Sequence, residues 1–156
     1  MLIQIDGRQQ DGRGSSGPRF VLRLAVDDAA GKVLSAIFRP NEDIRGYLEL
    51  MRELIADRGL PLALYSDRHG VFKCSGRPDA VHARHARAVG IRQIFARSPP
   101  AKGQVERVAG TFPDRLVTEL RRAGVLTLSG ANALLAGCSG RFNAGFGVAT
   151  RQPRSA

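Results

Sequence analysis

The sequence predicts an α/β protein in which helices flank a mixed five-stranded sheet. The first 40 residues contain three apolar or alternating stretches, separated by segments rich in Gly and Asp. Two more short apolar stretches, residues 61–66 and 91–96, alternate with segments that have helical character. Three consecutive strands followed by βα crossovers combine antiparallel and parallel pairs in one sheet.

The predicted strands begin with residues 2–6 (LIQID), a short strand that ends at Asp6. Residues 7–18 are polar and Gly-rich, and we expect them to be irregular. Residues 19–28 and 33–38 are aliphatic and β-branched around a Gly-containing loop, which is typical of a hairpin. Three antiparallel strands are therefore expected before any helix.

The first predicted helix follows Pro40, with Asn41 as its capping residue and Gly59 at its end. Its expected apolar face recurs at spacings of four, three and four residues, through Ile44, Leu48, Met51 and Ile55.

Two later segments, residues 79–89 and 104–110, are also expected to be helical, and Gly90 is expected to end the first of them. Pro113 is then an obstacle to a longer helix, since an interior proline costs roughly 3 kcal/mol. The final residues, 137–156, are rich in Gly, Ser and Arg, and we expect them to be poorly ordered. The 156 residues thus divide into a core over residues 1–125 and a partly disordered extension over 126–156.

Several classes of protein are disfavoured by composition. The two cysteines, Cys74 and Cys138, form no CxxC pair and have no histidine at zinc-like spacing, so we expect ordinary thiols in a reducing compartment. The sequence contains no apolar run of about 20 residues and no signal peptide at its start. We therefore expect a cytoplasmic protein that does not enter a membrane.

The net charge of +10 is unevenly distributed. Residues 1–66 carry nine basic and nine acidic side chains, whereas all the excess positive charge lies from Asp67 onward. A polyanion such as nucleic acid is the natural partner of that half. However, 21 of the 24 basic residues are arginine, and this bias can also reflect a GC-rich genome. Both interpretations stay open from charge alone.

Three carboxylates stand out by position. Asp67 directly follows the apolar stretch LALYS, where it either starts a turn or delivers a carboxylate to a site at the end of a strand. Asp6 ends the first predicted strand, and Glu106 opens the helix after the fifth. Carboxylates that converge repel one another, and Mg²⁺ or Mn²⁺ would neutralise them. Two such ions can activate a hydroxyl and stabilise a leaving oxygen in phosphodiester chemistry.

Four ordered motifs carry a family resemblance: LIQIDG, VDDAAGKVLSAIF, LALYSDRHGVFK and SPPAKGQVERVAGTFPDRLVTEL. Together they resemble the catalytic core of the DDE transposases and retroviral-type integrases, most closely the ISNCY group of bacterial insertion sequences. The resemblance covers most of residues 2–146 and implies a ribonuclease-H-like fold, DNA as substrate and a two-ion Mg²⁺ or Mn²⁺ site. The three acids of the pattern fall on Asp6, Asp67 and Glu106, with 60 and 38 residues between them.

The resemblance also bears on neighbouring residues. Lys102 and Arg107 flank the helix start that carries Glu106, where they can contact DNA phosphates, although a plain loop-to-helix junction and a solvated arginine are the simpler interpretations. Asp27 and Asp28 are expected to be turn residues rather than the first catalytic acid.

The predicted function is metal-dependent hydrolysis and strand transfer at DNA phosphodiesters, and a homo-oligomer is a further expectation. The alternative is a non-catalytic DNA-binding remnant, because a helix-turn-helix segment that transposases of this kind carry before the core is not in the sequence. A truncated transposase is therefore expected. An RNA-processing nuclease of the same fold is disfavoured, because such enzymes carry a fourth carboxylate late in the core and this chain has no acid after Glu119.

Overall fold

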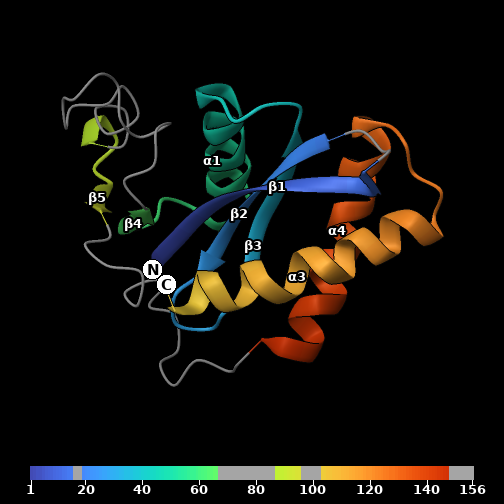
Figure 1. The fold of residues 1–156 in the computed structure, drawn as a ribbon. Coiled ribbons are helices and arrows are strands. Elements are labelled where there is room, and N and C mark those ends of the chain that lie inside the picture. Colours follow the sequence, from blue (N-terminus) through green and yellow to red (C-terminus); the bar gives the residue numbers. More distant parts are fainter. Residues whose placement is uncertain (16–18, 67–86, 96–102, 148–156) are drawn as a thin grey trace.

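A computed structural model describes residues 1–15, 19–66, 87–95 and 103–147, with side chains for 1–7, 20–66, 87–94 and 107–147. Its strands are β1 (Leu2–Ser15), β2 (Arg19–Asp27), β3 (Val33–Arg39), β4 (Ala63–Ser66) and β5 (Arg92–Phe95). Its helices are α1 (Ile44–Arg58), α3 (Gly103–Arg122) and α4 (Leu128–Phe146). Figure 1 shows this arrangement.

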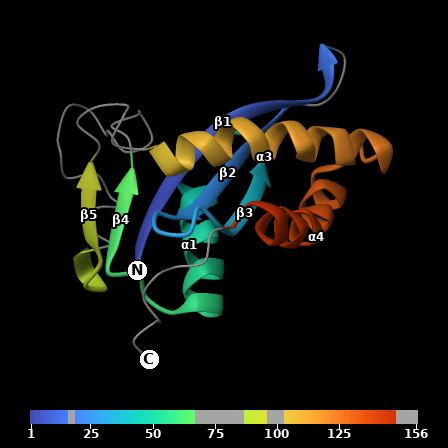
Figure 2. The same ribbon diagram turned by 90° about the horizontal axis from the view of Figure 1, so that it is seen from below.

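The five strands form one mixed sheet in the order β3-β2-β1-β4-β5. β1 pairs antiparallel with β2, and β2 pairs antiparallel with β3. β4 runs parallel to both β1 and β5. In Figure 2, β4 and β5 lie beside the first part of β1, whose far part continues with β2 alone. The predicted fold class, strand number and mixture of pairings are confirmed.

β1 is longer than the sequence suggested. It continues through the Gly-rich stretch to Ser15, and its pairing with β2 runs from Ile3–Asp27 to Asp11–Arg19. The expectation of an irregular segment after Asp6 was wrong. β2 offers a continuous row of backbone donors and acceptors, and ladder hydrogen bonds do not depend on the side chains of the paired residues.

α1 begins two residues later than predicted. Its N-cap is Asp43 rather than Asn41, and the Asp43 carboxylate accepts a 2.8 Å hydrogen bond from the Gly46 N–H. Gly59 ends the helix as predicted, at φ 79°. The buried apolar face was misplaced by about one residue, since Leu48 is 40% exposed. Tyr47, Leu50, Met51 and Leu54 pack on the sheet instead.

Each face of the sheet has its own hydrophobic cluster. α1 covers one face, where Ile3, Ile5 and Leu64 from β1 and β4 join its buried residues. α3 and α4 cover the other face, where Leu22 and Leu24 of β2 pack with residues of both helices. Adjacent strand residues alternate between the two clusters, as strand geometry requires.

The C-terminal part of the described chain is helical, contrary to expectation. α3 continues through Pro113, because the buried side chains of Phe112 and Leu116 on either side pack against the sheet and offset the lost hydrogen bond. α4 occupies residues 128–146, so the expectation of poor order was wrong for 137–146, while 148–156 lie outside the described residues. The proposed boundary after residue 125 falls in the α3–α4 connection, yet α4 contributes Leu135 and Phe142 to the shared cluster.

α4 also closes the edge of the sheet at β3. The Asn132 amide accepts from the Phe38 N–H at 2.7 Å and donates to the Phe38 carbonyl at 3.1 Å. Three helical turns later, Asn143 makes the same pair of bonds with Val33, at 2.8 and 2.7 Å. These two amides take the place of a sixth strand, because they satisfy backbone groups that an edge strand otherwise leaves unpaired.

Candidate active site

Asp6 lies inside β1, two residues after the last β1 residue that pairs with β4 in the described part of the chain. The parallel pairing with β4 ends at Gln4–Tyr65, whereas the antiparallel pairing with β2 continues and sets Asp6 opposite Leu24. The prediction that Asp6 ends the first strand was wrong, because β1 continues to Ser15 through its pairing with β2, and Asp6 lies in its interior. A β1 side chain at this position can face the carboxyl end of β4, the neighbouring strand.

The Asp6 side chain lies on the face of the sheet that α3 covers. Ile3 and Ile5 belong to the cluster under α1, so the residue after Ile5 faces the other way. Leu24, the cross-strand partner of Asp6, belongs to the cluster under α3 and α4. Asp6 is partly buried there. A carboxylate at the rim of this face is accessible to a second element that packs on it.

α3 brings Glu106 to this face by its backbone. The helix begins at Gly103, so Glu106 lies in its first turn. Val108 and Ala109, two and three residues later, are buried in the cluster that includes Leu24. The Glu106 side chain lies outside the described residues, and its direction is not assigned.

Asp67 directly follows Ser66, the last residue of β4, and lies outside the described residues together with Lys102. β4 itself forms as predicted and runs parallel to β1. Leu62, which was predicted to belong to this strand, lies just before it and is 73% exposed. Asp67 was interpreted either as the start of a turn or as a site carboxylate, and the position of β4 is the structural observation that bears on these two interpretations.

The two aspartates of the β2–β3 hairpin are turn residues, as predicted. The Asp27 carboxylate accepts a 3.1 Å hydrogen bond from the Ala29 N–H, and its carbonyl accepts from the Gly31 N–H at 2.8 Å. The Asp28 carboxylate accepts a hydrogen bond from the amide of Gln4. Both side chains thus stabilise the turn or anchor it to β1.

Two glutamines close to these acids, the buried Gln4 and the partly buried Gln93, were missed from the sequence. Gln4 is 2% exposed, pairs with Tyr65 of β4 and lies two residues before Asp6. Gln93 of β5 donates a 2.7 Å hydrogen bond to the hydroxyl of Ser66, which is fully buried. The available signal was an amide inside a short apolar stretch, LIQID or IRQIF, where an apolar residue is the ordinary choice.

A buried arginine lies on the opposite face, under the residue that follows Asp6. Arg23 pairs with Gly7, is 1% exposed, and donates a 3.0 Å hydrogen bond to the carbonyl of Asp43. Burial lowers its pKa, while the nearby Glu42 and Asp43 act in the opposite direction. Arg23 Nη2 lies 4.0 Å from Glu42 Oε1, and a Cβ at Gly7 would come into van der Waals contact with the same carboxylate oxygen at 3.4 Å.

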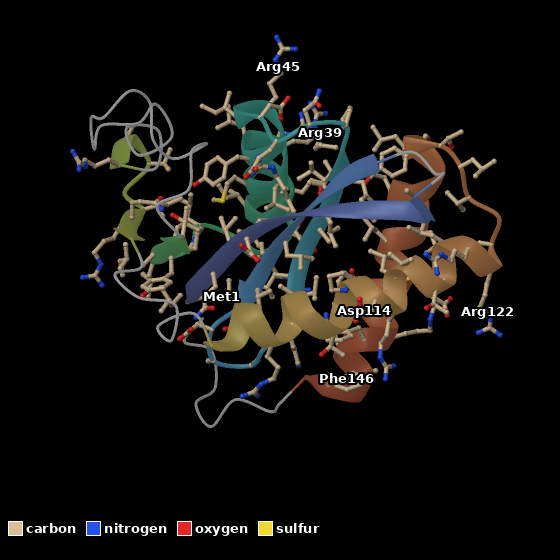
Figure 3. All side chains as sticks on the ribbon, in the orientation of Figure 1. Met1, Arg39, Arg45, Asp114, Arg122 and Phe146 are labelled. Atoms are coloured by element: carbon tan, nitrogen blue, oxygen red, sulfur yellow. The ribbon has the colours of Figure 1, made fainter. Side chains whose placement is uncertain are left out.

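The outer surface of α3 is basic. Arg107, Arg121 and Arg122 are exposed, and none of them forms an ion pair with the side chains that the structure describes. Figure 3 shows Arg122 at the carboxyl end of α3, pointing away from the body, and Arg45 projecting from α1 in another direction. Exposed guanidinium groups along a helix of about 30 Å can contact several phosphates of a nucleic acid.

Within the described side chains, no three His, Cys, Asp or Glu residues are grouped as metal ligands would be. His69, His82, His85 and Asp67 lie outside the described residues, and the side chain of Glu106 is not among the described side chains. None of the described helices combines the length and the apolar character needed to cross a membrane.

Comparisons with known proteins place these observations in context. The chain is 32% identical over 153 residues to a protein of Sinorhizobium fredii that is named a transposase (y4bF). It is 33% identical over 158 residues to the transposase for insertion sequence IS1202 of Streptococcus pneumoniae. These matches cover 94% and 96% of this chain and 34% of each relative. The chain thus spans about one third of the length of these curated relatives. No family model matches it.

Solved structures give the fold. The HTLV-2 integrase catalytic core domain, determined in complex with magnesium, superposes with a TM-score of 0.68 at 19% identity, covering 91% of this chain and 84% of that one. The BIV integrase catalytic core gives 0.63 at 21% identity, covering 99% of this chain and 86% of that one. The predicted ribonuclease-H-like fold is confirmed, and so is the resemblance to insertion-sequence transposases and integrase catalytic cores.

Proposed function

We propose that this chain is the catalytic core of a DDE-type transposase, which hydrolyses and joins DNA phosphodiesters at a site made by Asp6, Asp67 and Glu106. The observation that carries the proposal is the place of Asp6. It lies at the end of the β1–β4 pairing and on the face that α3 covers. The sequence similarity to transposases supports DNA as the substrate.

The register of β1 and β4 supports Asp67 as the second acid. Leu2, Ile3 and Gln4 pair with Ala63, Leu64 and Tyr65. If this register continues by two residues, Asp6 aligns with Asp67, and strand alternation directs both side chains to the same face. Neighbouring strands lie about 4.8 Å apart, a spacing at which two carboxylates can share cations.

The donor set suits hard divalent cations. Asp6 is a partly buried carboxylate on the face of the sheet that α3 covers, and two further carboxylates adjoin it in the proposal. Bound Mg²⁺ or Mn²⁺ ions would supply the activation of a hydroxyl and the stabilisation of the leaving oxygen. The chain itself would hold these ions through Asp6, Asp67 and Glu106 and hold the DNA backbone against them.

DNA would lie along the basic surface of α3. Arg107, Arg121 and Arg122 are exposed without acidic partners among the described side chains, and Lys102 precedes the helix. In the proposal, these cations contact phosphates on both sides of the carboxylates. Lys102 and Arg107, which the sequence predicted to contact DNA phosphates, keep this role in the proposal.

A second candidate function is a DNA-binding remnant without catalysis, and the same arginine surface favours it. Binding to phosphates requires the arginines of α3 and none of the three carboxylates. Catalysis therefore requires the carboxylates whereas DNA binding alone does not, so variants of these residues separate the two functions.

The decisive experiment is a plasmid-nicking assay with Mn²⁺, combined with duplex binding measured by fluorescence anisotropy. The unaltered chain is compared with Asp67→Asn and Glu106→Gln. We expect both variants to lose nicking while duplex binding is retained or slightly tighter, since a negative charge that faces phosphates is removed. Equal nicking by all three chains would show that the activity lies elsewhere. Binding without nicking by the unaltered chain would establish the remnant.

The DNA surface is tested separately. Changing both Arg121 and Arg122 to Gln should weaken duplex binding and lower the slope of log K against log salt by about 1 per lost phosphate contact. Arg45→Gln is the matched control, because it removes the same charge from α1. An equal effect of Arg45→Gln would assign the binding to overall charge rather than to α3.

A homo-oligomer is the remaining part of the proposal. The HTLV-2 integrase core is known in a trimeric and a dimeric form, and the simian T-cell lymphotropic virus protein that superposes with a TM-score of 0.74 is part of an intasome. Light scattering of the purified chain, with and without duplex DNA, tests it. A monomer under both conditions would contradict it.

A further inference from the structure

A groove of about 340 Å³ lies on the surface between α3 and α4. Its floor is apolar and is made of buried side chains from both helices: Phe112, Leu116, Cys138 and Phe142. Its rim is polar and consists of Arg115, Thr118, Glu119 and Arg141. An apolar floor with a few polar groups around it is the common form of a site for a small organic ligand.

A column of aromatic rings holds Arg115 at this rim. Phe142 contacts Phe112 edge-to-face, with ring centroids 5.1 Å apart, and stacks on Phe146 with centroids 4.9 Å apart. The guanidinium carbon of Arg115 lies 4.4 Å from the centroid of the Phe146 ring. Figure 3 shows Phe146 near the end of α4, below Asp114 of α3. The cation–π contact restrains an exposed side chain, so the guanidinium group keeps its place beside the groove.

The groove adjoins the basic surface of α3. Arg115 is exposed and forms no ion pair with the side chains that the structure describes. Arg122 follows it by about two helical turns, so both side chains lie on the same side of α3. Arg141 is bonded to Glu119 at 3.1 Å and contacts Cys138 Sγ at 3.4 Å. The uncompensated positive charge of the rim therefore comes from Arg115, on the helix whose arginines are proposed to bind DNA.

These features fit a nucleotide. A base offers a flat apolar surface to the floor of the groove, its phosphate can pair with Arg115, and an amino group on its edge can donate to Glu119. Bases within a duplex are stacked and paired, so a base must be unpaired to enter such a groove. The neighbouring arginine surface favours a nucleotide of bound DNA over a free one, because a bound duplex raises the local concentration of its own end.

We propose that the groove between α3 and α4 binds an unpaired base at the end of the DNA that lies along α3. The inference rests on the proposed function, because it takes the DNA-binding surface of α3 as given. It adds a contact region that includes none of the three acids and that distinguishes an overhanging DNA end from a blunt one. Bases that stack on aromatic side chains typically gain about tenfold or more in affinity per base.

The test uses fluorescence anisotropy with three duplexes of the same sequence. One is blunt, one ends in two unpaired adenine nucleotides, and one has two abasic residues in their place. The adenine and abasic ends carry the same number of phosphates, so the ratio of their dissociation constants reports the bases alone. We expect the adenine end to bind the unaltered chain about tenfold more tightly than the abasic end. Both affinities should fall with added salt while their ratio stays nearly constant, because base contacts release no counterions.

Two variants alter the groove. Thr118→Trp places a bulky ring in it from the exposed side of α3, and the ratio should fall to about one while blunt-duplex binding is unchanged. Arg115→Gln removes the cation that holds the nucleotide at the rim, and it should also lower the ratio. It is the second variant should Thr118→Trp not fold. Ala133→Trp is the matched control, since it adds the same ring to an exposed position of α4 outside the groove, and it should leave the ratio unaltered.

The outcomes separate the groove from the DNA surface. Equal affinity for the adenine and abasic ends, with blunt-duplex binding retained, would overturn the inference and leave the proposed function standing. A ratio that neither Thr118→Trp nor Arg115→Gln changes would place the base elsewhere and would also overturn it. Binding of free dAMP as tight as that of the adenine end would assign the groove to free nucleotides instead. Failure of all three duplexes to bind would overturn the proposed DNA surface and the inference with it.

Discussion

The two ends of the sheet differ in the polar groups they carry and in the hydrogen bonds that these groups form. At the β3 end, Asn132 and Asn143 satisfy both backbone groups of Phe38 and Val33 with partners from the same chain. At the β1–β4 end, the partly buried Asp6 and the buried amide of Gln4 lie among apolar residues, and Gln93 Oε1 finds no partner among the described residues. The first end is complete by itself. The second carries polar side chains beside buried apolar residues, as expected where a protein binds ions or substrate.

We expect the largest effect when one negative charge is removed beside the β1–β4 pairing, and no effect when one is removed from α1. Asp6→Asn should abolish Mn²⁺-dependent nicking without a large change in the urea midpoint, because the residue lies at the rim of the core. Asp57→Asn, a change of the same kind on the exposed end of α1, should leave nicking unaltered. Nicking by Asp6→Asn at the rate of the unaltered chain would remove β1 from the site.

Stability should depend most on the side that α3 and α4 cover. Phe112 is 1% exposed and makes an edge-to-face contact with Phe142, with ring centroids 5.1 Å apart. Phe112→Ala should lower the free energy of unfolding by about 3–5 kcal/mol, measured by urea denaturation. Leu54→Ala under α1 should cost about 2–5 kcal/mol. A negligible loss for Phe112→Ala would mean that α3 is not firmly packed on the sheet.

The edge closure by α4 can be weakened one amide at a time. Asn132→Ala and Asn143→Ala each remove two hydrogen bonds to β3 and should each cost about 1–3 kcal/mol, since backbone groups are left without partners. Ser139→Ala, on α4 between the two asparagines, is the control and should change stability by less than about 0.5 kcal/mol. We expect the double variant to associate through the exposed edge, visible as a larger species in size-exclusion chromatography. Asparagine variants as stable as the control would show that water satisfies β3 equally well.

The smallest effect is expected at the N-cap of α1. The N–H of Gly46 lowers the pKa of Asp43, with a further contribution from Arg39 and an opposing one from burial. Since the folded pKa lies below the unfolded value of about 3.9, the carboxylate adds stability above that pH and loses it as the pH falls through the folded pKa. Asp43→Asn keeps the cap and should cost about 0.5 kcal/mol at pH 7. The difference should vanish near pH 2, and a constant difference from pH 7 to 2 would contradict this origin.

The sequence predicted those parts of the molecule that obey local rules. The hairpin around Asp27, the strand before Ser66 and the end of α1 at Gly59 follow from strand composition and from the conformational freedom of glycine. What it missed depends on partners distant in the sequence. Residues after Asp6 form a strand because β2 pairs with them, and α4 is helical in spite of its glycines because Leu135 and Phe142 are buried against α3 and β3.

The same distinction between local rules and distant partners applies to the candidate site. Asp6 was identified from its position after an apolar stretch, and the structure adds the face on which it lies. The roles of Asp67 and Glu106 stay predictions. Gln4 and Gln93 could not be assigned from the sequence, because an amide on a strand acquires a role only from the neighbour that the register gives it.

The parallel pairing of β1 with β4 also has a consequence for the order of folding. The β1–β2 and β2–β3 pairs close short turns, whereas Leu2 meets Ala63 only after the whole intervening chain has been ordered. Closing a long loop costs more entropy, and such contacts form late in folding. The three-stranded meander should therefore assemble first, and the pairing of β1 with β4 beside Asp6 last. Destabilising changes in β4 should then accelerate unfolding and leave the refolding rate nearly constant.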